Sequence, residues 1–216
     1  MGNRGRFGKY GEVKRLKRLR EAKALNLRDT FPRFAGGSWP AGNVPAPRKL
    51  LAHCLVIRSA TKADAEFLAQ LSDRVFKQYG AYHRIIPEWL ETDMVWTLVA
   101  LYKAVRVGFA MLGPARLSDK GSYTAELLAI AVDPPWQGRG AGTVLLRKIL
   151  ELAGKIGLGE VWLHTAKQNA RARRVFEKFG FVIIEEKPDF YTGGQDAVAM
   201  VKRFKGSWIG QAGERP

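Results

Sequence analysis

The sequence has few of the residues that build disulfides and metal centres. Its 216 residues include one cysteine, Cys54, and three histidines. One thiol closes no internal disulfide, and the histidines are too far apart in sequence to form a paired-ligand motif. We therefore expect no metal site and a reducing compartment, the cytoplasm.

Long apolar runs are also lacking. The longest apolar stretch, residues 94–112, is interrupted by Lys103 and Arg106, whereas a membrane-spanning helix needs about 20 mainly apolar residues. The basic N-terminus has no apolar segment of the secretory type. Because 46% of the residues are hydrophobic, a packed core is expected, and we predict a soluble folded protein.

Acidic residues are scarce at one end of the chain. The net charge is +16, and residues 1–50 contain 13 Lys and Arg against 3 Asp and Glu. Residues 1–31 are predicted to be a basic, partly helical arm. This arm either lies on its own domain or contacts RNA, the ribosome, anionic lipid or another acidic surface.

The remaining boundaries follow from composition and periodicity. Residues 32–52 are rich in Pro and Gly and predict a linker, and residues 207–216 form a tail. Residues 53–206 alternate between strand and helix patterns, which predicts an α/β fold with a mixed sheet covered by helices. Strands are expected at 55–60, 96–104, 105–112, 123–132, 160–165, 181–186 and 197–204. Helices are expected at 61–80, 140–156 and 169–179, with a loop and a short helix after Pro87 between 81 and 93.

The stretch from 125 to 142 carries the chemical signal. An apolar strand runs into a turn at 133–135, and the sequence QGRGAG (137–142) then opens a helix. Glycines allow close approach of an anion, and the free N–H groups of a first helical turn bind phosphate oxygens. Arg139 adds a cationic donor. These residues predict a phosphate-bearing ligand, with a plain tight connection as the alternative.

Two motifs resemble the GNAT superfamily of N-acetyltransferases. The family signature Q/R-x-x-G-x-G/A is matched by Gln137, Gly140 and Gly142. The second motif, N-x-x-A-x-x-x-Y-x-x-x-G-F, is followed by Asn169, Ala172, Phe176, Gly180 and Phe181, with phenylalanine in place of tyrosine. The resemblance covers roughly residues 55–204 and excludes the basic arm.

The resemblance implies a GNAT-like central mixed sheet, splayed where two parallel strands separate. Acetyl-CoA would be the co-substrate, with its pantetheine bonded to the backbone of Ile130 and Val132 and its diphosphate on the amides of 138–143. Asn169 would contact the pantetheine arm, although asparagine also favours the N-cap position that it occupies. The implied cofactor-binding residues are Ile130, Ala131, Val132, Gln137, Gly138, Arg139, Gly140, Ala141, Gly142, Thr143, Asn169, Ala172 and Phe176.

Acetyl transfer to an amine needs a group that accepts a proton, because an ammonium has no lone pair. Glu126 is the first candidate, since histone-type members carry their general base at the matching position. His164 is the second, since ribosomal-protein N-terminal acetyltransferases have a glutamate base there. Glu126 could instead orient the substrate or lie at the surface, and His164 could be structural.

The resemblance departs from the family at Phe176, where many members have a tyrosine that protonates the sulfur of the coenzyme. Either another group such as Tyr191 serves, or the thiolate leaves unaided or is protonated by water. The acceptor is expected near residues 79–90 and 189–196, with Tyr82, His83, Glu88 and Tyr191 as candidate contacts.

We predict an N-acetyltransferase that acts on a primary amine of a protein or peptide, either an N-terminus or a lysine. The segment FYTGGQDAVAM resembles the ribosomal-protein N-terminal acetyltransferase branch. The alternatives are a small-molecule amine as acceptor, an acyl group other than acetyl, or a CoA-binding module associated with RNA or the ribosome that has lost transfer activity.

Overall fold

The computed structural model describes residues 54–204, except residues 93, 119 and 120. The predicted arm (1–31), linker (32–52) and tail (207–216) lie outside the described residues. No helix in the described part is both long enough and apolar enough to cross a membrane.

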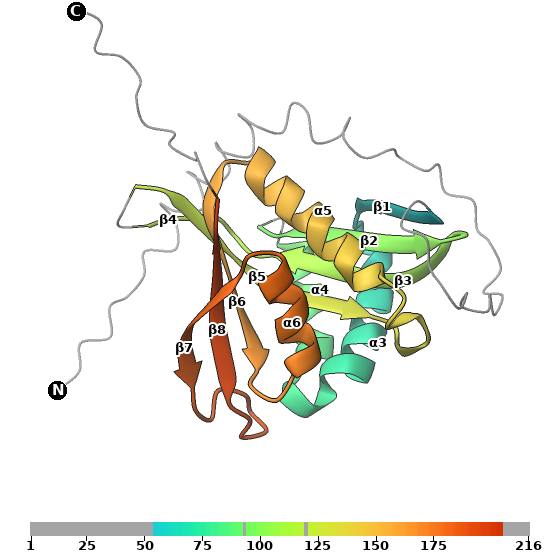
Figure 1. Ribbon diagram of the computed structural model, residues 1–216. Coiled ribbons are helices and arrows are strands. Elements are labelled where there is room, and N and C mark those ends of the chain that lie inside the picture. The colour runs from blue at the N-terminus through green and yellow to red at the C-terminus, as the bar shows by residue number, and fades with distance from the viewer. Residues whose placement is uncertain (1–53, 93, 119–120, 205–216) are drawn as a thin grey trace, which may run out of the picture. The chain divides into compact units, whose positions relative to one another are not determined.

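The described part alternates between strands and helices (Figure 1). The strands are β1 (Leu55–Ser59), β2 (Trp96–Tyr102), β3 (Val105–Leu112), β4 (Arg116–Leu117), β5 (Tyr123–Val132), β6 (Leu158–Ala166), β7 (Val182–Lys187) and β8 (Ala197–Arg203). The α-helices are α3 (Ala65–Phe76), α4 (Tyr82–Glu91), α5 (Ala141–Lys155) and α6 (Ala170–Lys178). Three short 3-10 helices are η2 (Lys62–Asp64), η3 (Lys77–Tyr79) and η4 (Pro134–Trp136).

All eight strands belong to one mixed sheet with the order β1-β2-β3-β5-β6-β8-β7, and β4 pairs with the start of β5 outside this order. The β5–β6 pair is parallel, and the other pairs are antiparallel. The predicted fold class, a mixed sheet flanked by helices, is therefore confirmed. The sheet also includes the two-residue strand β4, which the sequence did not predict.

Helices cover both faces of the sheet around β3. Phe109 and Met111 pack against Leu68 and Leu71 of α3 on one face. A Cβ placed on Gly108 would lie 3.2 Å from a methyl of Leu145 in α5. Gly108 and Ala110, which alternate with Phe109 and Met111 along β3, therefore face α5. The alternation of a strand thus separates the α3–α4 layer from the α5 layer.

A β-bulge in β5 changes which side chains reach each face. Met111 pairs with Ala129, but Leu112 pairs with Leu127, so Leu128 is an extra residue in β5. The inserted residue shifts the alternation by one. Glu126 therefore points toward the α3–α4 face, whereas Ile130, beyond the bulge, points toward α5.

The parallel pairing of β5 and β6 is short. It runs from Tyr123 opposite Leu158 to Glu126 opposite Trp162 and then stops. Beyond this point β5 stays paired with β3 through Val132, while β6 stays paired with β8 through Ala166. The sheet is consequently splayed between β5 and β6, as expected for the fold (Figure 1).

Helix α4 corrects one expectation. We predicted a loop followed by a short helix after Pro87, but the helix begins at Tyr82 and contains Pro87. Proline removes one intrahelical hydrogen bond, to the carbonyl of His83. Ile86 is completely buried in the core beside α3, and this packing holds the helix together across the missing bond.

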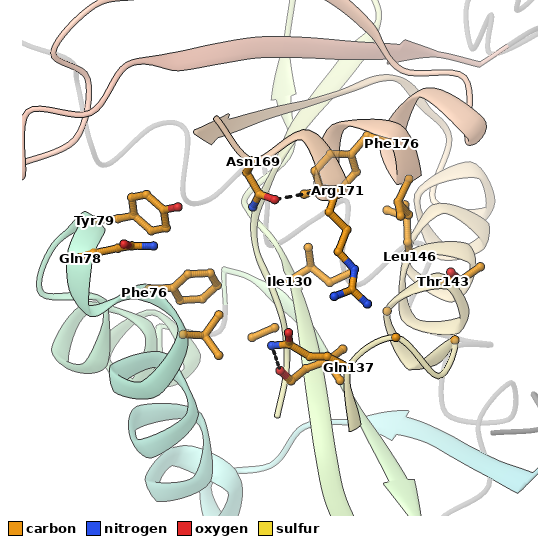
Figure 2. A pocket seen from close by; sticks show the side chains of 18 residues that line it. Phe76, Gln78, Tyr79, Ile130, Gln137, Thr143, Leu146, Asn169, Arg171 and Phe176 are labelled. Carbon is orange, nitrogen blue, oxygen red and sulfur yellow. Dashed lines mark hydrogen bonds between the residues drawn. The ribbon is translucent and has the colours of Figure 1, made fainter. Parts of the chain in front are cut away.

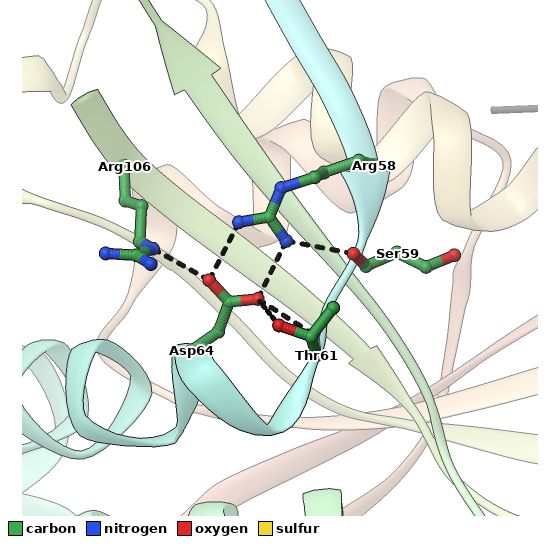
Figure 3. A network of polar contacts seen from close by, with 5 residues as sticks. All are labelled: Arg58, Ser59, Thr61, Asp64 and Arg106. Atoms are coloured by element: carbon green, nitrogen blue, oxygen red, sulfur yellow. Dashed lines mark hydrogen bonds and ion pairs between the residues drawn. The ribbon is translucent and has the colours of Figure 1, made fainter. Parts of the chain in front are cut away.

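A buried carboxylate fixes the start of α3 to the sheet. Asp64 accepts two hydrogen bonds from the Arg58 guanidinium of β1 at 2.7 and 2.8 Å and one from Arg106 of β3 at 2.7 Å. It also accepts hydrogen bonds from the amide and the hydroxyl of Thr61, at 2.8 and 3.1 Å (Figure 3). Burial alone would raise the pKa of Asp64, but the hydrogen bonds and charge of its partners lower it to about 2.

We predict that Asp64→Asn lowers the free energy of unfolding of the full chain by about 3 kcal/mol, because it leaves two arginines without their shared partner. Urea unfolding at pH 7 measures this difference. The folded-state pKa of Asp64, about 2, is below the value of about 3.9 for an unfolded chain. The stabilisation is therefore complete above about pH 4. It is lost as the pH falls toward 2, so the difference between the two proteins should shrink there.

Glu151→Gln is the matched control for this prediction. Its partner Lys148 lies on the same exposed face of α5, at 2.8 Å, so the substitution should change the free energy of unfolding by less than about 0.5 kcal/mol. Equal effects of both substitutions would show that Asp64 does not anchor α3.

Candidate functional site

A cleft opens where β5 and β6 separate, with a volume of about 590 Å³ (Figure 2). Its walls come from four parts of the fold. The end of α3 and η3 gives Val75, Phe76, Gln78 and Tyr79, and β5 gives Ile130, Ala131 and Val132. The turn and α5 give Gln137, Gly138, Gly140, Gly142, Thr143 and Leu146, and α6 with its N-cap gives Asn169, Arg171, Ala172, Val175 and Phe176.

The turn that opens α5 presents unpaired amides to this cleft. Gly138 and Gly140 have φ angles of 73° and 96°, in the left-handed region that glycine adopts without strain. The first intrahelical bond runs from Val144 N to Gly140 O, at 3.0 Å. The amides of the residues Gly138, Gly140, Ala141, Gly142 and Thr143 donate no hydrogen bond to any described residue. Five N–H groups are thus available to an anionic ligand.

The glutamine of the turn, Gln137, stabilises the turn itself. The Gln137 amide already donates to Pro134 O at 3.2 Å, so it is not one of the available donors. Its side-chain Nε2 donates to Val132 O at 2.9 Å, which joins the turn to the end of β5.

The open edge of β5 offers further backbone groups. The Asp133 amide donates to Val107 O of β3 at 2.9 Å. In an antiparallel pair of strands every second residue is hydrogen-bonded to the partner strand, so Ala131 and Ala129 bond to β3 as Asp133 does. The N–H and C=O groups of Ile130 and the N–H of Val132 consequently point toward the split. An extended ligand in the cleft could bond to them as a strand would.

The remaining predicted cofactor residues divide into two groups. Asn169 Oδ1 accepts the Ala172 amide at 3.1 Å, so the side chain caps α6 and lines the cleft as well. Arg139 and Ala141 do not line the cleft with their side chains. Arg139 Nε donates to Pro135 O at 3.0 Å, and Ala141 is buried under the turn.

Glu126 and His164, which the sequence offered as alternatives, form one pair. His164 Nδ1 and Glu126 Oε1 are 2.8 Å apart, with side-chain exposures of 21% and 43%. They lie on adjacent strands at the position where the β5–β6 pairing ends. The His164 ring stacks on Phe190, with centroids 4.5 Å apart and an interplanar angle of 17°.

Two tyrosines surround this pair. Burial raises the pKa of Tyr82, and the negative charge of Glu126 raises it further. Burial also raises the pKa of Tyr191 well above its usual range, as do Tyr82, Tyr79 and Glu126. Both hydroxyls are therefore protonated at neutral pH, and both lie close enough to the Glu126 carboxylate for its charge to raise their pKa.

The expected acceptor residues are only partly brought together. Tyr82 packs on Phe76, which lines the cleft, with centroids 5.4 Å apart. His83 is exposed and lies 3.8 Å from Asp73 Oδ1. Glu88 is exposed too, and six residues along a helix place it about 120° around α4 from Tyr82.

Sequence reasoning did not find several residues that line the cleft: Val75, Phe76, Gln78, Tyr79, Leu146, Arg171 and Val175. Tyr79 lay within the expected acceptor loop without being singled out. Arg171 follows the matched Asn169 by two residues, and that position was the available signal. Tyr191 is not among the lining residues, but its ring lies 4.8 Å from that of Tyr79.

A profile of the acetyltransferase (GNAT) family matches residues 64–181, more than half of the chain. The chain belongs to the GNAT family. Both the phosphate-type turn and the capped start of α6 fall within the matched residues, and the predicted family is confirmed.

Similar proteins include N-terminal acetyltransferases. The chain is 33% identical over 160 residues to the N-alpha-acetyltransferase RimI of Mycobacterium tuberculosis, covering 68% of this chain and 90% of that protein. It is 34% identical over 79 residues to the [ribosomal protein bS18]-alanine N-acetyltransferase of Escherichia coli, covering 35% of this chain and 53% of the relative. The structure of YncA, a putative acetyltransferase from Salmonella typhimurium with its cofactor acetyl-CoA, aligns with a TM-score of 0.61 and 24% identity. That alignment covers 69% of this chain and 94% of YncA.

The extent of these matches differs between relatives. The chain spans 40%, 61% and 53% of the length of three curated relatives that it matches, the E. coli enzyme among them. The resemblance to YncA, at 24% identity, concerns the fold alone.

We predict that Gly142→Glu weakens acetyl-CoA binding by more than tenfold, a loss of more than about 1.4 kcal/mol. Gly142 lines the cleft, and a Cβ there would lie 3.6 Å from a Val132 methyl, an ordinary contact, so the fold should tolerate a side chain. The carboxylate would extend toward the available amides and repel phosphate. Isothermal titration calorimetry with acetyl-CoA measures the dissociation constant.

Gly154→Glu is the matched control for this variant, because it places the same residue at the other end of α5. A Cβ there would contact only Phe204, at 3.9 Å. Circular dichroism should show both variants folded. Equal acetyl-CoA affinities for the two would contradict phosphate binding at the start of α5.

Proposed function

We propose that this GNAT-family chain binds acetyl-CoA in the cleft and transfers its acetyl group to a primary amine, the α-amine of a protein or peptide. One observation carries the proposal. The five unpaired amides and the open edge of β5 share a single cleft, and the Glu126–His164 pair lies where that split begins.

The chemistry of the cleft fits a CoA thioester, which supplies the acetyl group in activated form. The amides at the start of α5 and the positive end of its dipole suit the diphosphate. The backbone groups of Ile130 and Val132 suit the amides of a pantetheine arm. Phe76, Leu146 and Phe176 provide apolar walls along the same path.

The Glu126–His164 pair would accept the proton of the amine. An ionised carboxylate only accepts hydrogen bonds, so His164 Nδ1 donates to Glu126 Oε1. The lone pair of the ring is then on Nε2, and this atom takes the proton when the amine attacks. Glu126 holds the tautomer and stabilises the charged ring, and the stacked Phe190 fixes its plane.

The departing sulfur receives no proton from Phe176, which has none to give. Tyr191 is a poor proton donor because burial raises the pKa of its phenol. A thiol with a pKa of about 8.5 is an adequate leaving group as its thiolate. We propose that the thiolate leaves unaided or is protonated by water.

One comparison supports a protein α-amine as the acceptor, and one feature of the structure supports an amine acceptor in general. The M. tuberculosis relative, 90% of which is covered, is named an N-alpha-acetyltransferase. In this chain, aromatic rings of Tyr82, Phe190 and Tyr191 gather about the Glu126–His164 pair. Aromatic faces beside a carboxylate attract an ammonium group.

An acceptor panel tests this proposal with the full chain and acetyl-CoA. The panel contains peptides with a free N-terminus, N-terminally blocked peptides with a lysine, and small amines such as a polyamine. Thiol release gives the rate, and mass spectrometry locates the acetyl group. We expect acetylation of free N-termini. Exclusive acetylation of small amines would refute the acceptor class, and binding without transfer to any amine would indicate a CoA-binding module.

We predict that Glu126→Gln and His164→Gln each lower kcat by about 100-fold and leave the dissociation constant for acetyl-CoA within twofold. Because the two side chains act as a unit, the double variant should be about as slow as the slower single variant. Glu91→Gln, an exposed carboxylate on α4, is the control and should keep the wild-type rate. Losses that multiply in the double variant would assign the two residues independent roles.

We predict that Tyr191→Phe lowers kcat by less than tenfold, since a phenol that holds its proton contributes packing and a hydrogen bond rather than acid catalysis. The ring contacts with Tyr79 and Phe190 remain possible for phenylalanine. Steady-state thiol release measures kcat. A loss of 100-fold or more would make Tyr191 the acid that replaces the family tyrosine.

A further inference from the structure

Arg171 brings a positive charge into the cleft from α6. It is the second residue of that helix and lines the cleft on the wall opposite Phe76 and Tyr79 (Figure 2). Its guanidinium forms no hydrogen bond or ion pair with any described residue. Arginines at protein surfaces commonly find a carboxylate, so an unpaired one in a cleft can bind an anionic ligand.

The guanidinium lies directly over the phosphate-type turn. A Cβ placed on Gly138 would be 2.8 Å from Arg171 Nη2, closer than real Cβ atoms approach another group. The absence of a side chain at Gly138 therefore allows Arg171 to approach the turn. The unpaired amide of Gly138 and the guanidinium of Arg171 border the same space.

Arg171 takes the place that the sequence suggested for Arg139. Arg139 lies in the turn itself, but its Nε donates to Pro135 O and its side chain does not line the cleft. The cation beside the available amides thus comes from a segment more than 30 residues later in the chain.

We propose that Arg171 is a phosphate-binding residue that holds the diphosphate of the coenzyme against the amides at the start of α5. This inference rests on the proposed function, since it names a further residue of the same site. A guanidinium presents parallel N–H donors that match two phosphate oxygens, while the amides of α5 bind from the other side. The diphosphate would then join α5 to α6.

The test compares ligands that differ in their phosphates. Calorimetry and NMR titration measure dissociation constants of acetyl-CoA, its 3′-dephospho form and S-acetylpantetheine, which lacks phosphate. A hydrogen bond to a charged group contributes enough for Arg171→Gln to weaken both phosphorylated ligands by about 10- to 100-fold. Binding of S-acetylpantetheine should be unchanged. Arg171→Lys should retain part of the affinity, because the charge remains and the fork is lost.

Arg174→Gln is the matched control, one turn along α6, exposed and outside the lining of the cleft. It should alter acetyl-CoA affinity by less than threefold. Equal losses for Arg171→Gln and Arg174→Gln would assign the effect to the general positive charge of α6 and overturn the proposal. A loss confined to acetyl-CoA, absent for its dephospho form, would move Arg171 to the 3′-phosphate and also overturn it.

The failure of this inference is distinguishable from the failure of the proposed function. If the wild-type chain binds acetyl-CoA and Arg171→Gln binds it equally well, only the role of Arg171 is refuted. If the wild-type chain binds none of the three ligands, the proposed function is refuted.

Discussion

The extra residue at Leu128 is the constraint on which the site depends. It leaves Glu126 on the face of the sheet covered by α3 and α4, and Ile130 on the face covered by α5. The β5–β6 pairing ends at Glu126, two residues before this bulge. Gly113, opposite the bulge, has no side chain, and a Cβ there would lie 3.1 Å from Leu128 Cγ. One backbone irregularity thus aims the carboxylate of Glu126, and the strand edge beyond that residue is free of β6.

The two sides of the cleft provide different chemistry. On one side, α5 and α6 offer backbone N–H groups, a capping asparagine and an unpaired guanidinium, all of which suit an anion. On the other, η3, α4 and the loop after β7 bring aromatic rings and hydroxyls close to a carboxylate and an imidazole. Hydrogen bonds from Thr192 Oγ1 to Tyr79 O and from Gln195 Nε2 to Gln78 O join this loop to η3. The anionic and the amine-binding sides are therefore built from separate parts of the chain.

Local patterns in the sequence predicted the parts of the site that are local in the structure. The strand 123–132, the glycine turn and the cap at Asn169 each depend on neighbouring residues, and each was found where it was predicted. The Glu126–His164 contact spans 38 residues, and no periodicity indicates that two strands will align these side chains. Pro87 led to a wrong prediction for the start of α4. A proline disfavours a helix through its own backbone, which the sequence shows, but Ile86 stabilises this helix by packing against α3, which the sequence does not show. Arg171 was one of several arginines in a basic helix, and only the fold distinguishes it.

The short parallel pairing between β5 and β6 has a consequence for stability. Four residue pairs, Tyr123 to Glu126 on β5, connect the two parts of the sheet, and the space beyond them is the cleft. A molecule that occupies this space contacts both parts and substitutes for the missing strand contacts. Ligand occupancy and folding are then linked, and a ligand at 100 times its dissociation constant adds about 2.7 kcal/mol to the free energy of unfolding. The resistance of such a protein to heat and proteolysis would follow the supply of its ligand in the cell.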